Sequence, residues 1–160
     1  MNLIFILFYL MIQNGESFIK IKNLATDYCI DANSVSVFTN DCNFFLKTQK
    51  WIILMDSETL IHRVKTYQYV NSATSLCLDS DILSKNVFLN ECNRSKYSQK
   101  WSLDMQNSVN SLCLESNLDN SVNINNCDES SYNQKWLFEK HDKTTKITTN
   151  LIGFTLGKLI

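Results

Sequence analysis

The chain has 160 residues, the length of a single domain, and a formal net charge of −1 at pH 7. Its 15 lysines and arginines are scattered along the sequence, which excludes the basic surface of a typical nucleic-acid-binding protein. Proline is absent and glycine occurs three times, so turns have to be inferred from Asn, Asp and Ser.

The chain opens with an apolar run from Leu3 to Ile12, which has the length of a signal-peptide hydrophobic region. A run of this length is too short to span a bilayer. Gly15 and Ser17 place small residues at −3 and −1 of a cleavage site after Ser17. Residues 1–17 are therefore predicted to be a signal peptide and the protein to be secreted. The alternative is a buried first strand or a retained anchor, because no Lys or Arg precedes the apolar run.

Gln-Lys-Trp occurs three times and contains all three tryptophans of the chain. In every copy a cysteine lies nine residues before the Trp, an asparagine two residues before that cysteine, and a valine five residues before it. A Cys-[Ile/Leu]-[Asp/Glu] triplet stands further upstream in every copy. The Gln-Lys-Trp copies are at 49–51, 99–101 and 134–136, and the triplets are at 29–31, 77–79 and 113–115. Agreement at so many positions predicts a threefold internal repeat.

Within each repeat, apolar and polar residues alternate with a period of two, which is typical of β-strands, and no segment has a 3.6-residue apolar stripe. Residues 51–64 read as strand, turn and strand. Gln and Trp of each Gln-Lys-Trp copy are predicted to share one face, with Lys50, Lys100 and Lys135 turned to solvent. The predicted inner-face pairs are Val37/Thr39, Val87/Leu89 and Val122/Ile124, and the outer-face pairs are Phe38/Asn40, Phe88/Asn90 and Asn123/Asn125. The sequence thus predicts an all-β domain over residues 18–140, built from three units that share one core.

Six cysteines in a secreted chain predict disulfides, and six cysteines allow fifteen connectivities. If the three units are alike, each closes its own loop. The predicted pairs, 13, 15 and 14 residues apart, are Cys29–Cys42, Cys77–Cys92 and Cys113–Cys127. Zinc binding is the competing interpretation, but thiols at these spacings without a C-x2-C pair make a poor zinc site. Disulfides are therefore favoured.

The three Q-x-W motifs, each preceded by a Cys-[Ile/Leu]-[Asp/Glu] triplet and a second cysteine, resemble the ricin B-type lectins over about Asn23 to Phe138. The resemblance implies a β-trefoil, a pseudo-threefold barrel of twelve strands with one disulfide in each repeat. It also implies binding of galactose-type sugars in shallow pockets, up to one per repeat. The structural Q-x-W residues it implies are Gln49, Trp51, Gln99, Trp101, Gln134 and Trp136.

The sugar-binding residues of the family are only partly present. In the family an Asp two residues after the first cysteine binds sugar hydroxyls, an aromatic residue two before the second cysteine stacks on the ring, and an Asn just before Q-x-W contributes. The Asp position holds Asp31, Asp79 and Glu115; the aromatic position holds Asn40, Asn90 and Asn125; the last position holds Thr48, Ser98 and Asn133. No repeat therefore carries the complete set.

Phe38 and Phe88 lie two residues from the usual stacking position, on the same predicted face as Asn40 and Asn90. They are candidates to replace the missing aromatic platform, unless they pack under a neighbouring loop. The predicted carbohydrate-binding residues are Asp79, Phe88 and Asn90 in the second repeat, which is ranked first, Asp31, Phe38 and Asn40 in the first repeat, and Asn133 in the third. The wholly polar third repeat is otherwise interpreted as a solvated surface.

Catalysis has little support, because only His62 and His141 are available and no nucleophile with a base is seen. The sequence predicts no metal site and no cofactor. Asn93-Arg94-Ser95 is a glycosylation sequon. The apolar tail within residues 141–160 is predicted to be a last strand that closes the barrel, with a lipid-anchor signal as the alternative.

Two function classes follow from these patterns. The first is a secreted, non-enzymatic lectin-like protein whose partners are glycans or glycoproteins, with no nucleic-acid partner and no stable membrane insertion after signal cleavage. The second is a β-trefoil that has lost sugar binding and acts as a protein-binding or structural secreted factor. Asp31 and Asp79 favour the first class, and the missing aromatic residues favour the second.

Overall fold

The computed structural model describes residues 18–55 and 65–140. The predicted signal peptide at 1–17, the second strand predicted within 51–64, His62, His141 and the predicted C-terminal strand within 141–160 therefore lie outside the described residues. The described strands are β1 (Ile19–Asn23), β2 (Cys29–Asn33), β3 (Ser36–Asn40), β4 (Trp51–Met55), β5 (Tyr67–Asn71), β6 (Cys77–Ser80), β7 (Val87–Asn90), β8 (Cys113–Ser116), β9 (Val122–Asn125) and β10 (Trp136–Lys140). Short 3₁₀ helices are η1 (Lys47–Gln49), η3 (Tyr97–Gln99) and η4 (Tyr132–Gln134). In this part of the chain no helix has the length and apolarity needed to cross a membrane.

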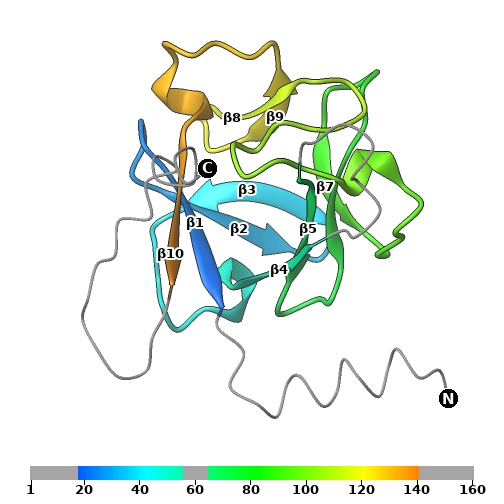
Figure 1. Ribbon diagram of the computed structural model, residues 1–160. Coiled ribbons are helices and arrows are strands. Elements are labelled where there is room, and N and C mark those ends of the chain that lie inside the picture. Colours follow the sequence, from blue (N-terminus) through cyan, green and yellow to red (C-terminus); the bar gives the residue numbers. More distant parts are fainter. Residues whose placement is uncertain (1–17, 56–64, 141–160) are drawn as a thin grey trace, which may run out of the picture.

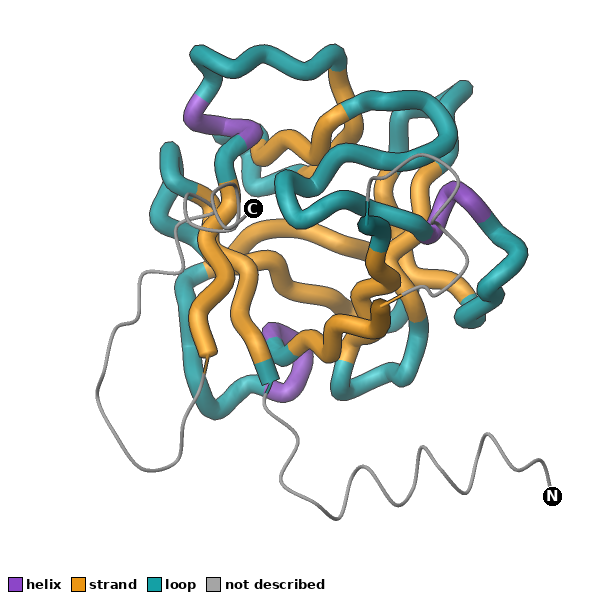
Figure 2. The backbone as a smooth tube through the Cα atoms, in the orientation of Figure 1, coloured by secondary structure: helices purple, strands orange, loops and turns teal. Residues whose placement is uncertain are grey.

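The strands form a closed antiparallel barrel (Figures 1 and 2). Eight of them make one sheet in the order β10-β1-β2-β3-β7-β6-β5-β4, and β1 also pairs with β4, so the sheet closes on itself. β8 and β9 pair separately and are tied to this sheet by the isolated bridges of Phe38 with Ser121 and of Asn86 with Asn123. The all-β prediction is confirmed.

Twelve strands are implied by the resemblance, but the described residues form ten named strands. The difference lies around Trp101, which makes only isolated bridges to Tyr67 and Asn107. The equivalent Trp51 begins a five-residue ladder that runs from Trp51↔Asn71 to Met55↔Tyr67. Residues 102–106 instead turn tightly, with the Met105 N–H donating to the Ser102 carbonyl at 3.1 Å, so no room is left for a ladder.

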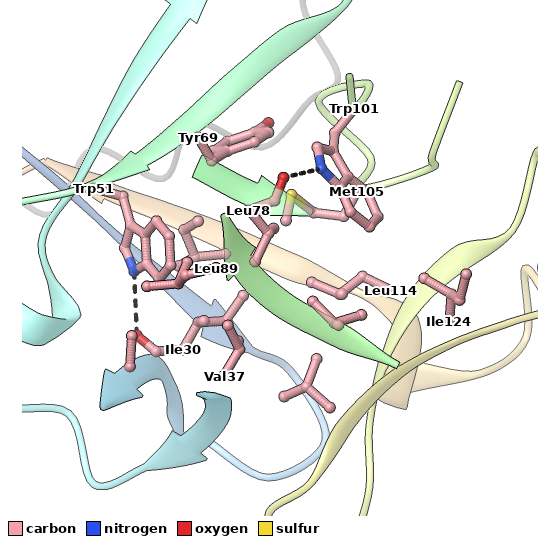
Figure 3. Packing of buried hydrophobic residues seen from close by; sticks show 14 of the residues in the cluster. Ile30, Val37, Trp51, Tyr69, Leu78, Leu89, Trp101, Met105, Leu114 and Ile124 are labelled. Atoms are coloured by element: carbon pink, nitrogen blue, oxygen red, sulfur yellow. Dashed lines mark hydrogen bonds between the residues drawn. The ribbon is translucent and has the colours of Figure 1, made fainter. Parts of the chain in front are cut away.

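The barrel interior holds the residues that the alternation assigned to it (Figure 3). Trp51 and Trp101 are fully buried, whereas Trp136 is half-buried against the same cluster. Each indole N–H donates to a backbone carbonyl: Trp51 to Ile30 at 3.2 Å, Trp101 to Leu78 at 3.1 Å and Trp136 to Leu114 at 2.9 Å. The inner-face pairs Val37/Thr39, Val87/Leu89 and Val122/Ile124 are all buried, as predicted.

The prediction that the lysine of each Gln-Lys-Trp copy faces solvent is wrong for Lys100, which is 2% exposed. Lys50 and Lys135 are half-buried. Each glutamine ends a 3₁₀ turn and not a strand, so strand alternation does not reach the lysine. The Lys100 ammonium lies 4.4 Å from the centroid of the Tyr97 ring, so it is sheltered by a cation–π contact.

All six cysteines pair as the repeat predicts: Cys29–Cys42, Cys77–Cys92 and Cys113–Cys127. The Cα atoms of each pair are 5.0 Å apart, within the range of unstrained disulfides. Each bridge closes a loop of 13 to 15 residues, for which the chain-entropy treatment gives about 3 kcal/mol of stabilisation. The loops that follow the second cysteines are thereby pinned beside the Asp and Glu positions.

Candidate functional site

A buried glutamine holds each carboxylate that the sequence singled out. Gln49 Nε2 donates to Asp31 Oδ2 at 3.0 Å and to the Asp41 carbonyl at 2.8 Å, and its Oε1 accepts from the Asn43 N–H at 2.7 Å. The corresponding bonds join Gln99 to Asp79, Glu91 and Asn93, and Gln134 to Glu115, Asn126 and Asp128. The glutamine of each Q-x-W motif therefore connects a carboxylate to the loop that follows the second cysteine.

Asp31, Phe38 and Asn40 lie together on the outer face of the β2–β3 pair. Asp31 is directly opposite Phe38, and Asn40 is opposite Cys29. Asp31 is 4% exposed, and its carboxylate receives two hydrogen bonds, from Gln49 and from the Ala32 N–H at 2.8 Å. An ionised carboxylate has about four acceptor positions, so about two have no donor among the described residues. Phe38 is half-buried and Asn40 is exposed at the edge of this group.

Lys20 contacts the glutamine of the first site, a role that was not predicted from the sequence. It is 2% exposed, its Nζ donates to Gln49 Oε1 at 3.3 Å, and it lies 4.0 Å from the centroid of the Phe44 ring. Burial lowers the pKa of Lys20 to about 8, although the charge of Glu139 opposes this shift. Gln68 takes the same place in the second unit and donates to Gln99 Oε1 at 3.1 Å. Both residues are second in the strand that opens their unit, and this matching position could have identified them.

Asp79, Phe88 and Asn90 also lie together, on the β6–β7 pair, with Asp79 opposite Phe88. Donors from the protein itself occupy the acceptor positions of the Asp79 carboxylate. Oδ1 accepts from the Ser80 N–H at 2.9 Å, and Oδ2 accepts from Lys96 Nζ at 2.9 Å, Gln99 at 3.1 Å and Asn90 Nδ2 at 3.2 Å. Asp79 is 1% exposed. Its acceptor positions are therefore taken, and the second repeat is less open to a neutral sugar than its sequence ranking implies.

The hydrogen bonds to Asp79 also set its ionisation. Burial alone would raise the pKa of Asp79, but hydrogen bonds from Ser98, Lys96 and Gln99, with the charge of Lys96, lower it below its usual value. A carboxyl whose pKa is depressed in the native state adds stability above its unfolded-state pKa of about 3.9 and loses it as pH falls through the native pKa.

We therefore expect the free energy of unfolding of Asp79→Asn to fall less steeply than that of the native chain as pH decreases below about pH 4. Urea unfolding at a series of pH values measures this against the native chain. Lys96→Gln is the matched variant; because it removes a charge that depresses the pKa, the native pKa of Asp79 moves closer to its unfolded-state value and the loss of stability on acidification should be smaller than in the native chain. Parallel curves for all three proteins would show that Asp79 does not titrate in this way.

The third unit is organised differently. Glu115 is half-buried; it accepts from Gln134 at 2.6 Å and from Asn125 Nδ2 at 3.4 Å. Asn133 lies in η4, and the contact recorded for it is through its backbone carbonyl, not its side-chain amide. Asn123, opposite Glu115, has a buried Oδ1 without a hydrogen-bond partner among the described residues. The predicted role of Asn133 therefore has no geometric support beyond its place next to Gln134.

Three asparagines that sequence reasoning missed position the glutamines. Asn71 Nδ2 donates to the Thr48 carbonyl at 2.7 Å, Asn107 Nδ2 to the Ser98 carbonyl at 2.8 Å, and Asn23 Nδ2 to the Asn133 carbonyl at 2.8 Å. Each acceptor is the residue just before a Q-x-W glutamine. Each asparagine also stands six residues before the first cysteine of its unit, and this spacing is the signal that could have found it.

The described residues contain no group of three or more His, Cys, Asp or Glu side chains placed to hold a metal ion. What the first and second units present is a buried carboxylate, an aromatic ring on the facing strand and an amide two residues further on. Such a set can accept from hydroxyls, cover an apolar ring face and fix its orientation.

The model of the ricin-type beta-trefoil lectin domain matches residues 65–151, which is more than half of the chain. No curated protein sequence matches the chain. Similar solved structures include a GlcNAcα1-4Gal releasing endo-β-galactosidase from Clostridium perfringens, at 13% identity and a TM-score of 0.61 over 79% of this chain and 33% of that chain. The chain thus spans about a third of that enzyme.

Two further similar structures are sugar complexes. One is a non-toxic homologue of type II RIPs from Momordica charantia (bitter gourd) in complex with α-methyl-D-galactoside, with 16% identity and a TM-score of 0.58 over 77% of this chain and 48% of that chain. The other is SeviL bound to asialo-GM1 saccharide, with 17% identity and a TM-score of 0.57 over 78% and 97% of the two chains. At these identities the likeness concerns the fold.

Proposed function

Because the chain belongs to the ricin-type beta-trefoil lectin domain family, we propose that it is a carbohydrate-binding protein that recognises galactose-type glycans on a cell or matrix surface. The observation that carries this proposal is the outer face of β2–β3, where Asp31 keeps unused acceptor positions beside Phe38 and Asn40. Sugar complexes among the similar structures support the ligand class. We further propose that the protein acts by binding alone, without catalysis.

The three units are proposed to be pseudo-symmetric repeats of a β-trefoil. Three disulfides of matching position support this. A cycle of contacts supports it too, because Asn71, Asn107 and Asn23 each reach from one unit to the Q-x-W segment of the preceding unit. Such a cycle holds three candidate sites on one rigid frame, so binding at one of them need not require the others.

For a neutral sugar the first unit is the better site, because the protein occupies the Asp79 carboxylate but leaves about two acceptor positions free on Asp31. We expect Asp31→Ala to weaken binding of a galactoside by about ten- to a hundredfold, since charge-assisted hydrogen bonds contribute about 1.5–3 kcal/mol. Isothermal titration of a hit from a glycan array measures the loss.

Phe38→Ala should weaken the same ligand, whereas Asp79→Ala should leave its affinity within about twofold provided that the fold is intact. Unchanged affinity in the Asp31 and Phe38 variants would move the site elsewhere in the molecule. The absence of any glycan hit would overturn the function.

A protein-binding or structural role is the second candidate, and the asparagines at the usual aromatic position, Asn40, Asn90 and Asn125, favour it. Exposed apolar side chains are groups through which such a role could act. Phe45 is 91% exposed, Leu83 93% and Leu118 94%, and each lies in a turn or loop. Exposed apolar groups of this kind are typical of surfaces that contact other macromolecules when they form a patch. A chain that binds no glycan but does bind a glycoprotein stripped of its sugars would identify this role.

Secretion is proposed from the apolar run at residues 3–12 and is supported by the three disulfides, which persist in oxidising compartments.

The glycosylation sequon at Asn93 is accessible. Asn93 is exposed, and its Oδ1 accepts from the Ser95 N–H at 2.9 Å, so this hydrogen bond does not use the amide nitrogen. Expression in a secreting eukaryotic host should give a mature chain that begins at Phe18 and carries a glycan on Asn93. Mass spectrometry measures both, and Ser95→Ala is the control that should lose the glycan alone. A retained residue 1–17 segment would contradict secretion by this route.

A further inference from the structure

An open polar depression of about 370 Å³, called the cavity below, lies beside the Asp79 site. It is formed by the end of β7 and the loop that leads to η3, and its wall includes Asn90 and Lys96, both of which contact the Asp79 carboxylate. The residues that line it are Asn90, Glu91, Cys92, Asn93, Arg94 and Lys96. The cavity is therefore the space next to Asp79 that a ligand of the second unit could occupy.

A ligand in the cavity meets a cation and not the carboxylate beneath it. The side chain of Asp79 is 1% exposed and that of Lys96 is 44% exposed. Lys96 Nζ uses one donor on Asp79 at 2.9 Å, and an ammonium has three donors, so about two remain. Arg94 is exposed and forms no ion pair with the residues at 18–55 and 65–140. Both cations can therefore donate to a ligand.

The other two units lack these cations. The positions of Arg94 and Lys96 are held by Phe44 and Leu46 in the first unit and by Glu129 and Ser131 in the third. The second unit has thus lost an accessible acceptor for sugar hydroxyls and has gained two donors that carry charge. This exchange reverses the kind of group that the site can recognise.

We propose that the cavity of the second unit binds an anionic group of a glycan, a sulfate or a carboxylate, through Arg94 and Lys96. The proposal rests on the proposed carbohydrate-binding function but assigns this unit a different ligand class from the neutral sugar of the first. The planar guanidinium of Arg94 pairs with two oxygens of such a group, and Lys96 adds a point charge. Asp79 then acts as a positioning residue, because it holds the Lys96 ammonium at the cavity wall.

Glu91 also lines the cavity and provides an internal control. Its side chain carries the charge sign that an anionic ligand carries, so it opposes binding of that ligand. Removing its charge with Glu91→Gln should strengthen binding of an anionic glycan, and it should leave a neutral galactoside unchanged.

Asn93 lines the cavity, so a glycan attached to it would compete with a ligand there. The test therefore uses the oxidised, refolded chain without that glycan, and three galactosides that are neutral, sulfated or sialylated. We expect the sulfated or the sialylated ligand to lose about tenfold or more in affinity with Arg94→Ala or Lys96→Gln. Glu91→Gln should raise the affinity of that ligand by about two- to fivefold. The affinity should also fall steeply as the salt concentration is raised. Lys96→Gln keeps a donor for Asp79, and circular dichroism confirms the fold of each variant. The ligand that responds identifies the anion as sulfate or carboxylate.

Four results would overturn the proposal. One is anionic binding that neither Arg94→Ala nor Glu91→Gln alters. Another is a Lys96→Gln variant that binds the neutral galactoside more strongly, which would show that Lys96 blocks a site for a neutral sugar. The third is the absence of anionic binding while the neutral galactoside still binds and still depends on Asp31, which would leave the proposed function standing. Loss of all glycan binding would overturn both.

Discussion

Trp101→Ala is expected to lower the free energy of unfolding by about 3–5 kcal/mol, the usual cost of deleting a buried aromatic side chain. Trp101 is fully buried and lies near Met105 and Leu78 in the core (Figure 3). Its indole N–H also satisfies the Leu78 carbonyl at 3.1 Å, and its backbone exchanges hydrogen bonds with Tyr67 at 2.8 and 2.9 Å. Deletion of the side chain therefore leaves a cavity and an unpaired carbonyl at the point where the barrel has bridges in place of a ladder.

Trp136→Ala is the matched control. This tryptophan occupies the same place in the third Gln-Lys-Trp copy and donates to Leu114 at 2.9 Å, but it is half-buried. Its replacement should lower the free energy of unfolding by about half as much, because less of its apolar surface is removed from water on folding. Chemical denaturation at fixed pH measures both free energies. A Trp136 variant that is less stable than the Trp101 variant would contradict the core assignment.

The period-two pattern predicted the core because burial on one face of a strand is a local property of the sequence. Val37, Val87 and Val122 lie inside the barrel for this reason. The disulfides followed from the repeat, since three similar loops have one pairing that treats them alike. Both inferences need only residues that are close in the sequence or related by the repeat.

The orientation of Lys100 could not be predicted in this way. Its neighbour Gln99 ends a 3₁₀ turn, and strand alternation stops there. Sequence alternation carries no information about a turn type without glycine or proline to mark it. The short link at residues 102–106 escaped prediction for a similar reason, because its effect appears only when Trp101 is compared with the five-residue ladder of Trp51.

The occupancy of Asp79 was also hidden from the sequence. A motif identifies the carboxylate, but whether it is free depends on a lysine 17 residues away that belongs to no motif. Lys96 differs from its counterparts Leu46 and Ser131, so the repeat gives no warning of it. A binding site read from a family pattern thus predicts the residues that come together, and it does not predict which of their hydrogen-bonding positions are already used.

Gln99→Leu is expected to lower the free energy of unfolding by about 3–5 kcal/mol, because a buried group left without a partner costs about 1–3 kcal/mol. Gln99 is fully buried and makes four hydrogen bonds. Its Nε2 donates to Asp79 at 3.1 Å and to the Glu91 carbonyl at 2.8 Å. Its Oε1 accepts from the Asn93 N–H at 2.8 Å and from Gln68 at 3.1 Å. Leucine fills the volume but leaves the Glu91 carbonyl and the Asn93 N–H without this partner, so the loss is mainly polar. Asp79 keeps its other donors, and Gln68 keeps its bond to the Asn93 carbonyl at 3.2 Å.

Gln134→Leu in the third unit separates this effect from a general effect of the Q-x-W position. Gln134 is 8% exposed and makes three such bonds, to Glu115, Asn126 and Asp128. Water can reach some of those partners, so the expected cost is about 1–2 kcal/mol. Urea unfolding of the two variants gives the comparison, and equal costs would show that the fourth bond and the deeper burial of Gln99 do not matter.

Gln99→Leu should also lower the affinity for any ligand held by Arg94 and Lys96, because the hydrogen bond from the Asn93 N–H to Gln99 fixes the start of the loop that carries them. Gln134→Leu should not.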